Sequence, residues 1–162
     1  MSDIIISGYY GLGNSGDEAL LKSIVEDLKS INPDITITAL SGNAALTERL
    51  YGIKTVSRTN LFSIIREFRS AKLLLSGGGT LIQDATSTKS LIYYLGIMSL
   101  AKKMGLKVML YANGMGPIKD KNIKKVHKVL ENADLITLRE STSLEEIRRC
   151  NITKPEVIVT AD

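Results

Sequence analysis

Short apolar runs alternate along the chain with segments in which apolar residues recur every three or four positions. The short runs predict β-strands at Ile4–Ser7, Ile35–Leu40, Lys54–Val56, Leu73–Ser76, Lys107–Tyr111, Leu135–Leu138 and Val157–Val159. The periodic segments predict helices at about 17–31, 44–51, 60–70, 88–104, 121–132 and 141–148. Strand and helix therefore alternate throughout.

Several predicted strands are continuous apolar runs, which is typical of parallel strands covered by helices on both faces. Repeated strand–helix–strand units connect by right-handed crossovers. The pattern therefore predicts an α/β fold with a Rossmann-like, doubly wound, mainly parallel sheet of about seven strands.

Residues at the helix ends support these boundaries. The first helix has one apolar stripe and ends at Asn32-Pro33. The stripe consists of Leu20, Leu21, Ile24, Val25 and Leu28. Asn60 and Ser141 stand where N-caps are expected, because their side chains can accept a hydrogen bond from the first helical turn.

Glycines and polar residues follow the predicted strands at their carboxyl ends. These segments are Gly8–Asp17, Ser76–Thr88, Asn113–Pro117 and Arg139–Ser141. The carboxyl ends of parallel strands lie at one edge of the sheet, where open α/β sheets bind ligands. The sequence therefore predicts a ligand site at this edge.

The length of 162 residues is sufficient for one domain with a hydrophobic core. A predicted strand lies at the end of the chain, and no helix follows to cover it. We therefore expect residues 1–162 to form a single N-terminal Rossmann-like domain of a longer protein, without its C-terminal domain. A complete domain that ends in an edge strand is the alternative.

Cysteine usage and hydropathy restrict the chemistry. Cys150 is the only cysteine, which excludes an intrachain disulfide and a zinc site made of several cysteines. No other pattern of metal ligands occurs, and no segment resembles a signal peptide. The longest apolar run, Leu91 to Ala101, is too short to span a bilayer. We expect a cytoplasmic protein without a metal ion.

The formal net charge is +4, and part of the excess lies at Lys119, Lys121, Lys124, Lys125 and Lys128. A solvated helix face explains this run, and attraction to anionic lipid head groups or an acidic substrate is the functional alternative. A peripheral contact with the inner face of the membrane therefore stays open. Nucleic acid is not an expected partner, because the chain has only six tyrosines, two phenylalanines and no tryptophan.

The first glycine-rich segment contains Gly11-x-Gly13-x-x-Gly16, which matches the dinucleotide fingerprint. The second predicted strand ends without the acid that would hold a ribose, and Asp17 with Glu18 would repel a pyrophosphate. We therefore reject a nicotinamide cofactor. Asn14 and Asp17 are instead candidates for binding sugar hydroxyls; alternatively, the glycines only permit a tight turn and Asp17 caps the helix.

The next three segments also supply candidate ligand-binding groups. Gly77, Gly78 and Gly79 expose backbone N–H groups that suit an anion or a sugar ring, with Asp84 and Thr86 as polar neighbours. A flexible crossover loop is the alternative.

Asn113 either contacts a ligand or satisfies loop backbone. Arg139 follows an apolar strand, and its planar guanidinium suits a carboxylate or phosphate. The alternative is that Arg139 forms a salt bridge to Glu140 or to another local acid.

Four motifs in this order resemble the polysaccharide pyruvyl transferase family, and the CsaB type within it most closely. They are Gly8-Tyr9-Tyr10-Gly11-x-Gly13-Asn14-x-Gly16-Asp17-Glu18-Ala19, Ser76-Gly77-Gly78-Gly79-Thr80-Leu81-Ile82-Gln83-Asp84, Asn113-Gly114-x-Gly116-Pro117 and Leu138-Arg139-Glu140. The resemblance implies one half of a GT-B-like, two-domain enzyme that moves the enolpyruvyl unit of phosphoenolpyruvate onto a sugar as a cyclic ketal.

The resemblance further implies a lipid-linked glycan acceptor, an N-acetylmannosamine of a secondary cell wall polymer precursor, and a role in S-layer anchoring. It implies that Arg139 binds phosphoenolpyruvate, the donor substrate, and that no cofactor is required. It places a histidine and another basic residue of the donor site in the C-terminal domain, so we expect this chain to be inactive alone. A nucleotide-sugar glycosyltransferase, a glycan-binding module and self-association stay open.

Overall fold

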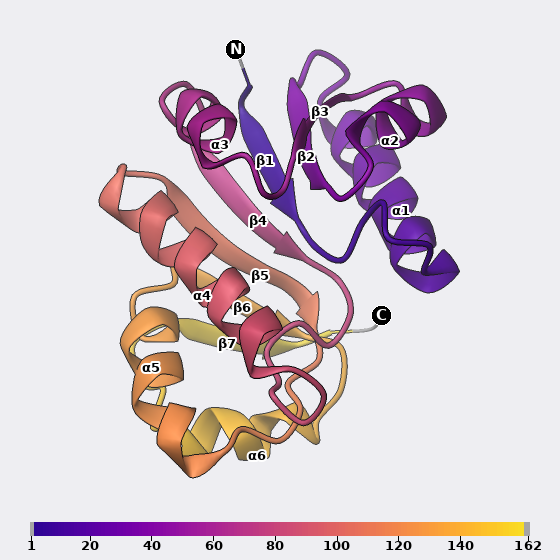
Figure 1. Cartoon of the computed structure of the whole chain (residues 1–162). Helices are drawn as coiled ribbons and strands as arrows, with labels where there is room; N and C mark the ends of the chain where they lie inside the picture. The colour runs from indigo at the N-terminus through magenta and orange to yellow at the C-terminus, as the bar shows by residue number, and fades with distance from the viewer. Residues whose placement is uncertain (1, 161–162) are drawn as a thin grey trace.

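The computed structural model describes residues 2–160, which form one parallel sheet of seven strands flanked by helices (Figure 1). The strands are β1 (Ile4–Ser7), β2 (Ile37–Ser41), β3 (Lys54–Ser57), β4 (Leu73–Gly77), β5 (Lys107–Asn113), β6 (Leu135–Leu138) and β7 (Glu156–Val159). The helices are α1 (Ser15–Ile31), α2 (Ala44–Tyr51), α3 (Leu61–Phe68), α4 (Thr88–Lys103), α5 (Asp120–Leu130) and α6 (Ser143–Arg149). The predicted α/β fold is confirmed.

The strand order is β3-β2-β1-β4-β5-β6-β7, so the direction of winding reverses between β1 and β4. Helix α1 packs on one face of the sheet, where Leu21 and Ile24 join a core with Ile4 and Ile6. Helices α3 to α6 cover the opposite face (Figure 1), and there Ile5 belongs to the larger core. Because ligands bind at such a reversal, this topology places a site beyond the ends of β1 and β4.

Helix boundaries show one correction to the sequence interpretation. Asn60 caps α3 as predicted, because its side chain accepts a hydrogen bond from the Ser63 N–H at 3.1 Å. Ser141 was expected to cap the last helix, and this prediction is wrong. Its carbonyl accepts from the Leu144 N–H (3.0 Å) in a preceding turn, and Thr142 stands at the N-cap without a side-chain bond.

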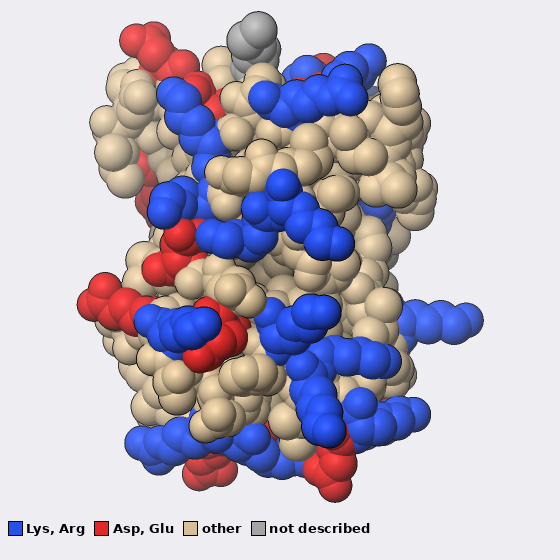
Figure 2. Space-filling model, turned by 90° about the vertical axis from the view of Figure 1, so that its left-hand side faces the viewer, with Lys and Arg blue, Asp and Glu red and all other residues tan. Residues whose placement is uncertain are grey.

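Lysine and arginine side chains cover much of the side of the molecule shown in Figure 2. Cations also lie in the last turns of helices, such as Lys102 and Lys103 in α4, where free carbonyl groups favour positive charge. Lys102 and Lys107 both pair with Asp134, at 2.7 and 3.0 Å. The five lysines between positions 119 and 128 are exposed, as expected for a solvated face around α5. No helix in residues 2–160 is long and apolar enough to cross a bilayer.

Candidate functional site

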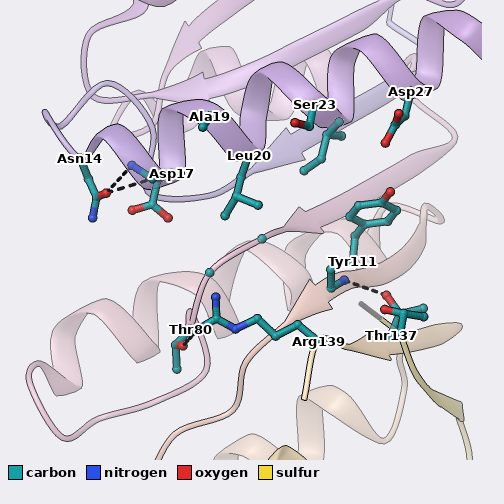
Figure 3. A pocket seen from close by; sticks show the side chains of 16 residues that line it. Asn14, Asp17, Ala19, Leu20, Ser23, Asp27, Thr80, Tyr111, Thr137 and Arg139 are labelled. Carbon is teal, nitrogen blue, oxygen red and sulfur yellow. Dashed lines mark hydrogen bonds between the residues drawn. The ribbon is translucent and has the colours of Figure 1, made fainter. Parts of the chain in front are cut away.

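A cavity of about 790 Å³, here called the main cavity, opens at the carboxyl edge of the sheet (Figure 3). Its lining comes from α1 and the residue before it, from the ends of β5 and β6, and from the segments that follow β4, β6 and β7. The described residues that line it are Asn14, Gly16, Asp17, Ala19, Leu20, Ser23, Ile24, Asp27, Gly78, Gly79, Thr80, Tyr111, Ala112, Thr137, Arg139 and Thr160. The cavity therefore lies at the reversal of winding, where the topology places a ligand.

The first turn of α1 forms one wall of the main cavity. Asn14 is the N-cap, because its Oδ1 accepts from the N–H groups of Gly16 (3.0 Å) and Asp17 (3.3 Å). Asp17 therefore does not cap the helix, and its carboxylate points into the cavity (Figure 3). Burial raises the pKa of Asp17, Glu18 raises it further, and Arg139 opposes the rise.

The glycine loop after β4 forms the adjacent wall, and hydrogen bonds hold it at several points. The Tyr10 hydroxyl donates to the Gly77 carbonyl at 2.6 Å, and the Gly78 N–H donates to the Tyr111 carbonyl at 2.9 Å. Gly78 and Gly79 have φ of +69° and +67°, a conformation that only glycine adopts at little cost. The alternative of a flexible crossover loop is therefore disfavoured.

Each glycine of this loop has its own reason to lack a side chain. A Cβ at Gly77 would come within 2.9 Å of the Tyr10 hydroxyl and of Ile24, so Gly77 permits α1 to pack closely and does not line the cavity. A Cβ at Gly79 would lie 2.9 Å from the Asp17 Oδ1. The glycine loop and the Asp17 carboxylate are therefore close neighbours.

Arg139 lies across the main cavity from α1, directly after β6 (Figure 3). Its Nη2 donates to the Thr80 Oγ1 at 3.0 Å, which orients the guanidinium along the glycine loop. A Cβ at Gly114 would come within 3.1 Å of the Arg139 Nε, so a glycine there leaves room for this side chain. The cavity thus presents a cation and a carboxylate on opposite walls.

A second hollow of about 440 Å³, here called the side cavity, shares Asn14, Asp17 and Thr80 with the main cavity. Its other described lining residues are Tyr9, Leu81, Gln83, Thr86, Ser87, Ser90 and Tyr94. Among the described residues, this lining contains amides, hydroxyls, two aromatic rings, the Leu81 side chain and the Asp17 carboxylate, but no lysine or arginine. Such a set of side chains suits a neutral ligand rich in hydroxyl groups better than an anion.

Three of the residues predicted for the site line neither cavity: Gly77, as described above, Asp84 and Asn113. Asp84 is fully buried and accepts from the Lys119 N–H (2.8 Å) and from the Asn122 Nδ2 (2.6 Å). Burial acts to raise the pKa of Asp84, but these bonds outweigh it and hold the pKa below its ordinary value. Asn113 is also buried and donates to the Ser76 carbonyl at 2.7 Å. The Asp84 side chain holds its loop to the start of α5, and the Asn113 side chain joins the end of β5 to β4.

The sequence interpretation missed several residues of the main cavity, among them Asp27, Tyr111 and Thr137. Asp27 lies along α1 from Asp17, and Tyr111 is beneath it (Figure 3). Burial first and the Asp27 carboxylate second raise the pKa of Tyr111. Thr137 Oγ1 accepts from the N–H of Ala112, whose φ of +46° marks a bulge in β5. Asp27 follows Ser23 by four residues and Leu20 by seven on one face of α1, so helical spacing was an available signal for Asp27, whereas the strand residues had none.

Potential metal ligands are not clustered in the described part of the chain. Within residues 2–160, no group of three or more histidine, cysteine, aspartate or glutamate side chains could hold a metal ion.

Residues 14–162 match a family model described as polysaccharide pyruvyl transferase, so the match covers most of the chain and all four motifs from Asn14 onward. The comparison with curated proteins found no match.

Proposed function

This chain belongs to the polysaccharide pyruvyl transferase family, and on this premise we propose that its main cavity binds phosphoenolpyruvate for transfer of the enolpyruvyl unit to a sugar as a cyclic ketal. The observation that carries the proposal is the placement of Arg139 and Asp17 on opposite walls of one cavity beside the glycine loop. One wall suits an anion, and the other suits a hydroxyl group.

We assign Arg139 to the carboxylate or phosphate of the donor. A guanidinium can hold either group through two parallel hydrogen bonds, and such charge-assisted bonds are stronger than neutral ones. The bond from Arg139 to Thr80 fixes the side chain beside Gly79, where the backbone lets a ligand approach closely. Arginine is preferred over lysine here because its geometry matches a planar anion.

We assign the side cavity to the acceptor sugar. Gln83 and Thr86 hydrogen-bond to each other at 2.8 Å and offer further polar atoms toward this cavity, and Tyr9 supplies an aromatic face. The side cavity meets the main cavity at Asn14 and Asp17. A sugar hydroxyl at this junction would lie beside both the donor and the Asp17 carboxylate.

The reaction requires one proton at the methylene carbon of phosphoenolpyruvate and two new C–O bonds at the ketal carbon. Two sugar hydroxyls supply these oxygens, the bond from the ketal carbon to the phosphate oxygen breaks, and phosphate leaves. Of the two hydroxyl protons, one balances the proton gained by the methylene carbon and the other leaves with phosphate. The raised pKa of Asp17 suits it to accept a hydroxyl proton.

The finer substrate assignments follow the family resemblance. We propose an N-acetylmannosamine in a lipid-linked precursor of a secondary cell wall polymer as the acceptor, and a cytoplasmic reaction at the inner face of the membrane. We also propose that a C-terminal domain completes the donor site with a histidine and a further basic residue.

An NMR titration of the chain with phosphoenolpyruvate tests the donor assignment. We expect amide shifts at Gly78, Gly79 and Arg139, and an affinity about 10- to 100-fold weaker in R139A, because one charged hydrogen-bonded contact contributes about 1.5–3 kcal/mol. R148A removes an exposed cation outside both cavities and should bind as wild type does. Equal binding by R139A, or shifts with a nucleotide sugar alone, would refute the assignment.

A further inference from the structure

An apolar groove of about 510 Å³ runs between α3 and α4 on the sheet face opposite α1 (Figure 1). Its described lining is Arg58, Thr59, Leu61, Ile64, Tyr93, Gly96, Ile97 and Leu100. Leu61 is 57% exposed at the groove, and Phe62 beside it is 77% exposed. Exposure of two large apolar side chains in succession is costly in water and marks a surface that binds something apolar.

The polar groups of the groove are confined to one end. Arg58 and Thr59 follow β3 at the carboxyl edge of the sheet, close to the candidate site, whereas Leu100 lies near the far end of α4. Between these ends the lining is hydrocarbon and the ring of Tyr93. The occupant should therefore be apolar along its length and polar or anionic only at the end near the site.

Arg58 connects this groove to the side cavity. Its guanidinium carbon lies 4.3 Å from the ring centre of Tyr93, which lines the groove. It also lies 5.5 and 5.8 Å from the ring centres of Tyr94 and Tyr9, which line the side cavity. The groove and the side cavity therefore meet at one cation between three aromatic rings.

The environment of Arg58 leaves this cation with an unused donor. The Tyr93 hydroxyl donates to the Arg58 carbonyl at 3.0 Å and so fixes the ring against the start of the groove. Within residues 2–160, the Arg58 Nη1 is buried and makes no hydrogen bond. The Arg58 Nη2 donates to the Tyr94 hydroxyl at the long distance of 3.5 Å, and Arg58 is half-buried and lines the groove, so an anionic group of a ligand can pair with the accessible part of the guanidinium.

We propose that the α3–α4 groove binds the hydrocarbon chain of a lipid-linked glycan, with the anionic linker at Arg58 and the glycan in the side cavity. The proposal rests on the proposed function for the identity of the glycan as acceptor. The apolar groove, Arg58 and the side cavity follow one another along the surface. The hydrocarbon chain, the anionic linker and the sugar of such a molecule follow one another in the same order. A peptide fits less well, because the middle of the groove lacks polar side chains that could bind a peptide backbone.

Gly96 allows the groove to be blocked without disturbing the fold. It is exposed in α4 and lines the groove, and a Cβ built on it meets no atom within 4 Å. Replacement of a helical glycine also favours the helix. G96F should therefore fill the groove with a ring, and G96A is the matched control that adds only a methyl group.

The test is an NMR titration with farnesyl monophosphate below its micelle concentration, and inorganic phosphate is the head-group control. We expect shifts at Tyr93, Gly96 and Leu100 with farnesyl monophosphate only. We expect at least tenfold weaker binding by G96F and a change below twofold in G96A. R58Q should weaken binding of farnesyl monophosphate but not of farnesol. Equal binding by G96F, or shifts elsewhere, would overturn the proposal.

Phosphoenolpyruvate, titrated in parallel, separates this proposal from the proposed function. Binding of phosphoenolpyruvate without farnesyl monophosphate would overturn the lipid groove and leave the donor site standing. Binding of farnesyl monophosphate without binding of phosphoenolpyruvate would overturn the donor assignment and leave the lipid groove standing. Sedimentation of the wild type as a dimer that G96F converts to a monomer would also overturn the proposal, because the groove would then bind a second copy of the chain.

Discussion

Asp84→Asn should destabilise the fold, because the Asp84 carboxylate joins two loops inside the protein. Its oxygens accept from the Lys119 N–H at 2.8 Å and from the Asn122 Nδ2 at 2.6 Å, and the residue has no exposed surface. Asparagine keeps the size of the side chain but presents an NH₂ group to one of these donors. One hydrogen bond is therefore replaced by two donors that face each other.

The magnitude follows from the two contacts. A hydrogen bond to a charged group contributes about 1.5–3 kcal/mol, and a buried donor without a partner costs about 1–3 kcal/mol. We expect D84N to lower the free energy of unfolding by roughly 3 kcal/mol at neutral pH. For a urea dependence of about 2 kcal/mol/M, the midpoint of unfolding then falls by about 1.5 M.

The effect of Asp84 should also depend on pH. Burial acts to raise its pKa, but the bonds from Asn122 and Lys119 lower the pKa below the ordinary 3.8. A carboxylate with a lowered pKa stabilises the fold fully above its unfolded pKa, and this stabilisation is lost as pH falls through the folded pKa. The difference between wild type and D84N should therefore be constant near neutrality and decrease only below about pH 4.

Urea unfolding followed by circular dichroism at pH 7, 5 and 3 measures both effects. D34N removes an exposed carboxylate and is the control, for which we expect a change within about 0.5 kcal/mol. A loss under about 1 kcal/mol in D84N at pH 7 would refute the reasoning, since neither bond could then have the expected strength. A loss that persists unchanged at pH 3 would show that the charge of Asp84 is not responsible.

Three further substitutions test how the glycine-rich segments are held. Y10F removes the 2.6 Å bond to the Gly77 carbonyl and should cost about 1–2 kcal/mol, lowering the calorimetric Tm by about 2–8 °C and speeding amide exchange in the glycine loop. G11A should cost more than G13A in the same calorimetric assay, although both glycines have positive φ. A Cβ at Gly11 would lie 2.5 Å from the Asn43 N, whereas one at Gly13 meets nothing within 4 Å.

The strands and helices could be predicted because hydrophobic periodicity determines which faces are buried. Their boundaries depend on single contacts that periodicity does not contain. β2 begins at Ile37 rather than at the predicted Ile35, because the Ile35 N–H donates to the Asn32 carbonyl in a turn. The error at Ser141 has the same origin, since its carbonyl closes a turn before α6 begins.

The candidate site could be predicted in part, because parallel strands bring their carboxyl ends to one edge. Asn14, Asp17 and Arg139 line the main cavity for this reason. Asp84 and Asn113 follow strands as well, but their side chains turn inward to partners 35 to 38 residues away in sequence. A sequence pattern does not show which polar residue of a loop meets such a distant donor or acceptor.

The acidic pair after the glycine fingerprint gives a structural argument against a dinucleotide at this site. The Glu18 carboxylate accepts from the Gly11 N–H at 2.6 Å and from the Tyr51 hydroxyl at 2.8 Å, so the chain itself uses the donor that a pyrophosphate would need. Of this pair, only Asp17 lines the main cavity, opposite Arg139. A pyrophosphate at the start of α1 would meet the negative charge of Asp17, whereas a ligand pair with an anion at one end and a hydroxyl at the other matches the charges of both walls.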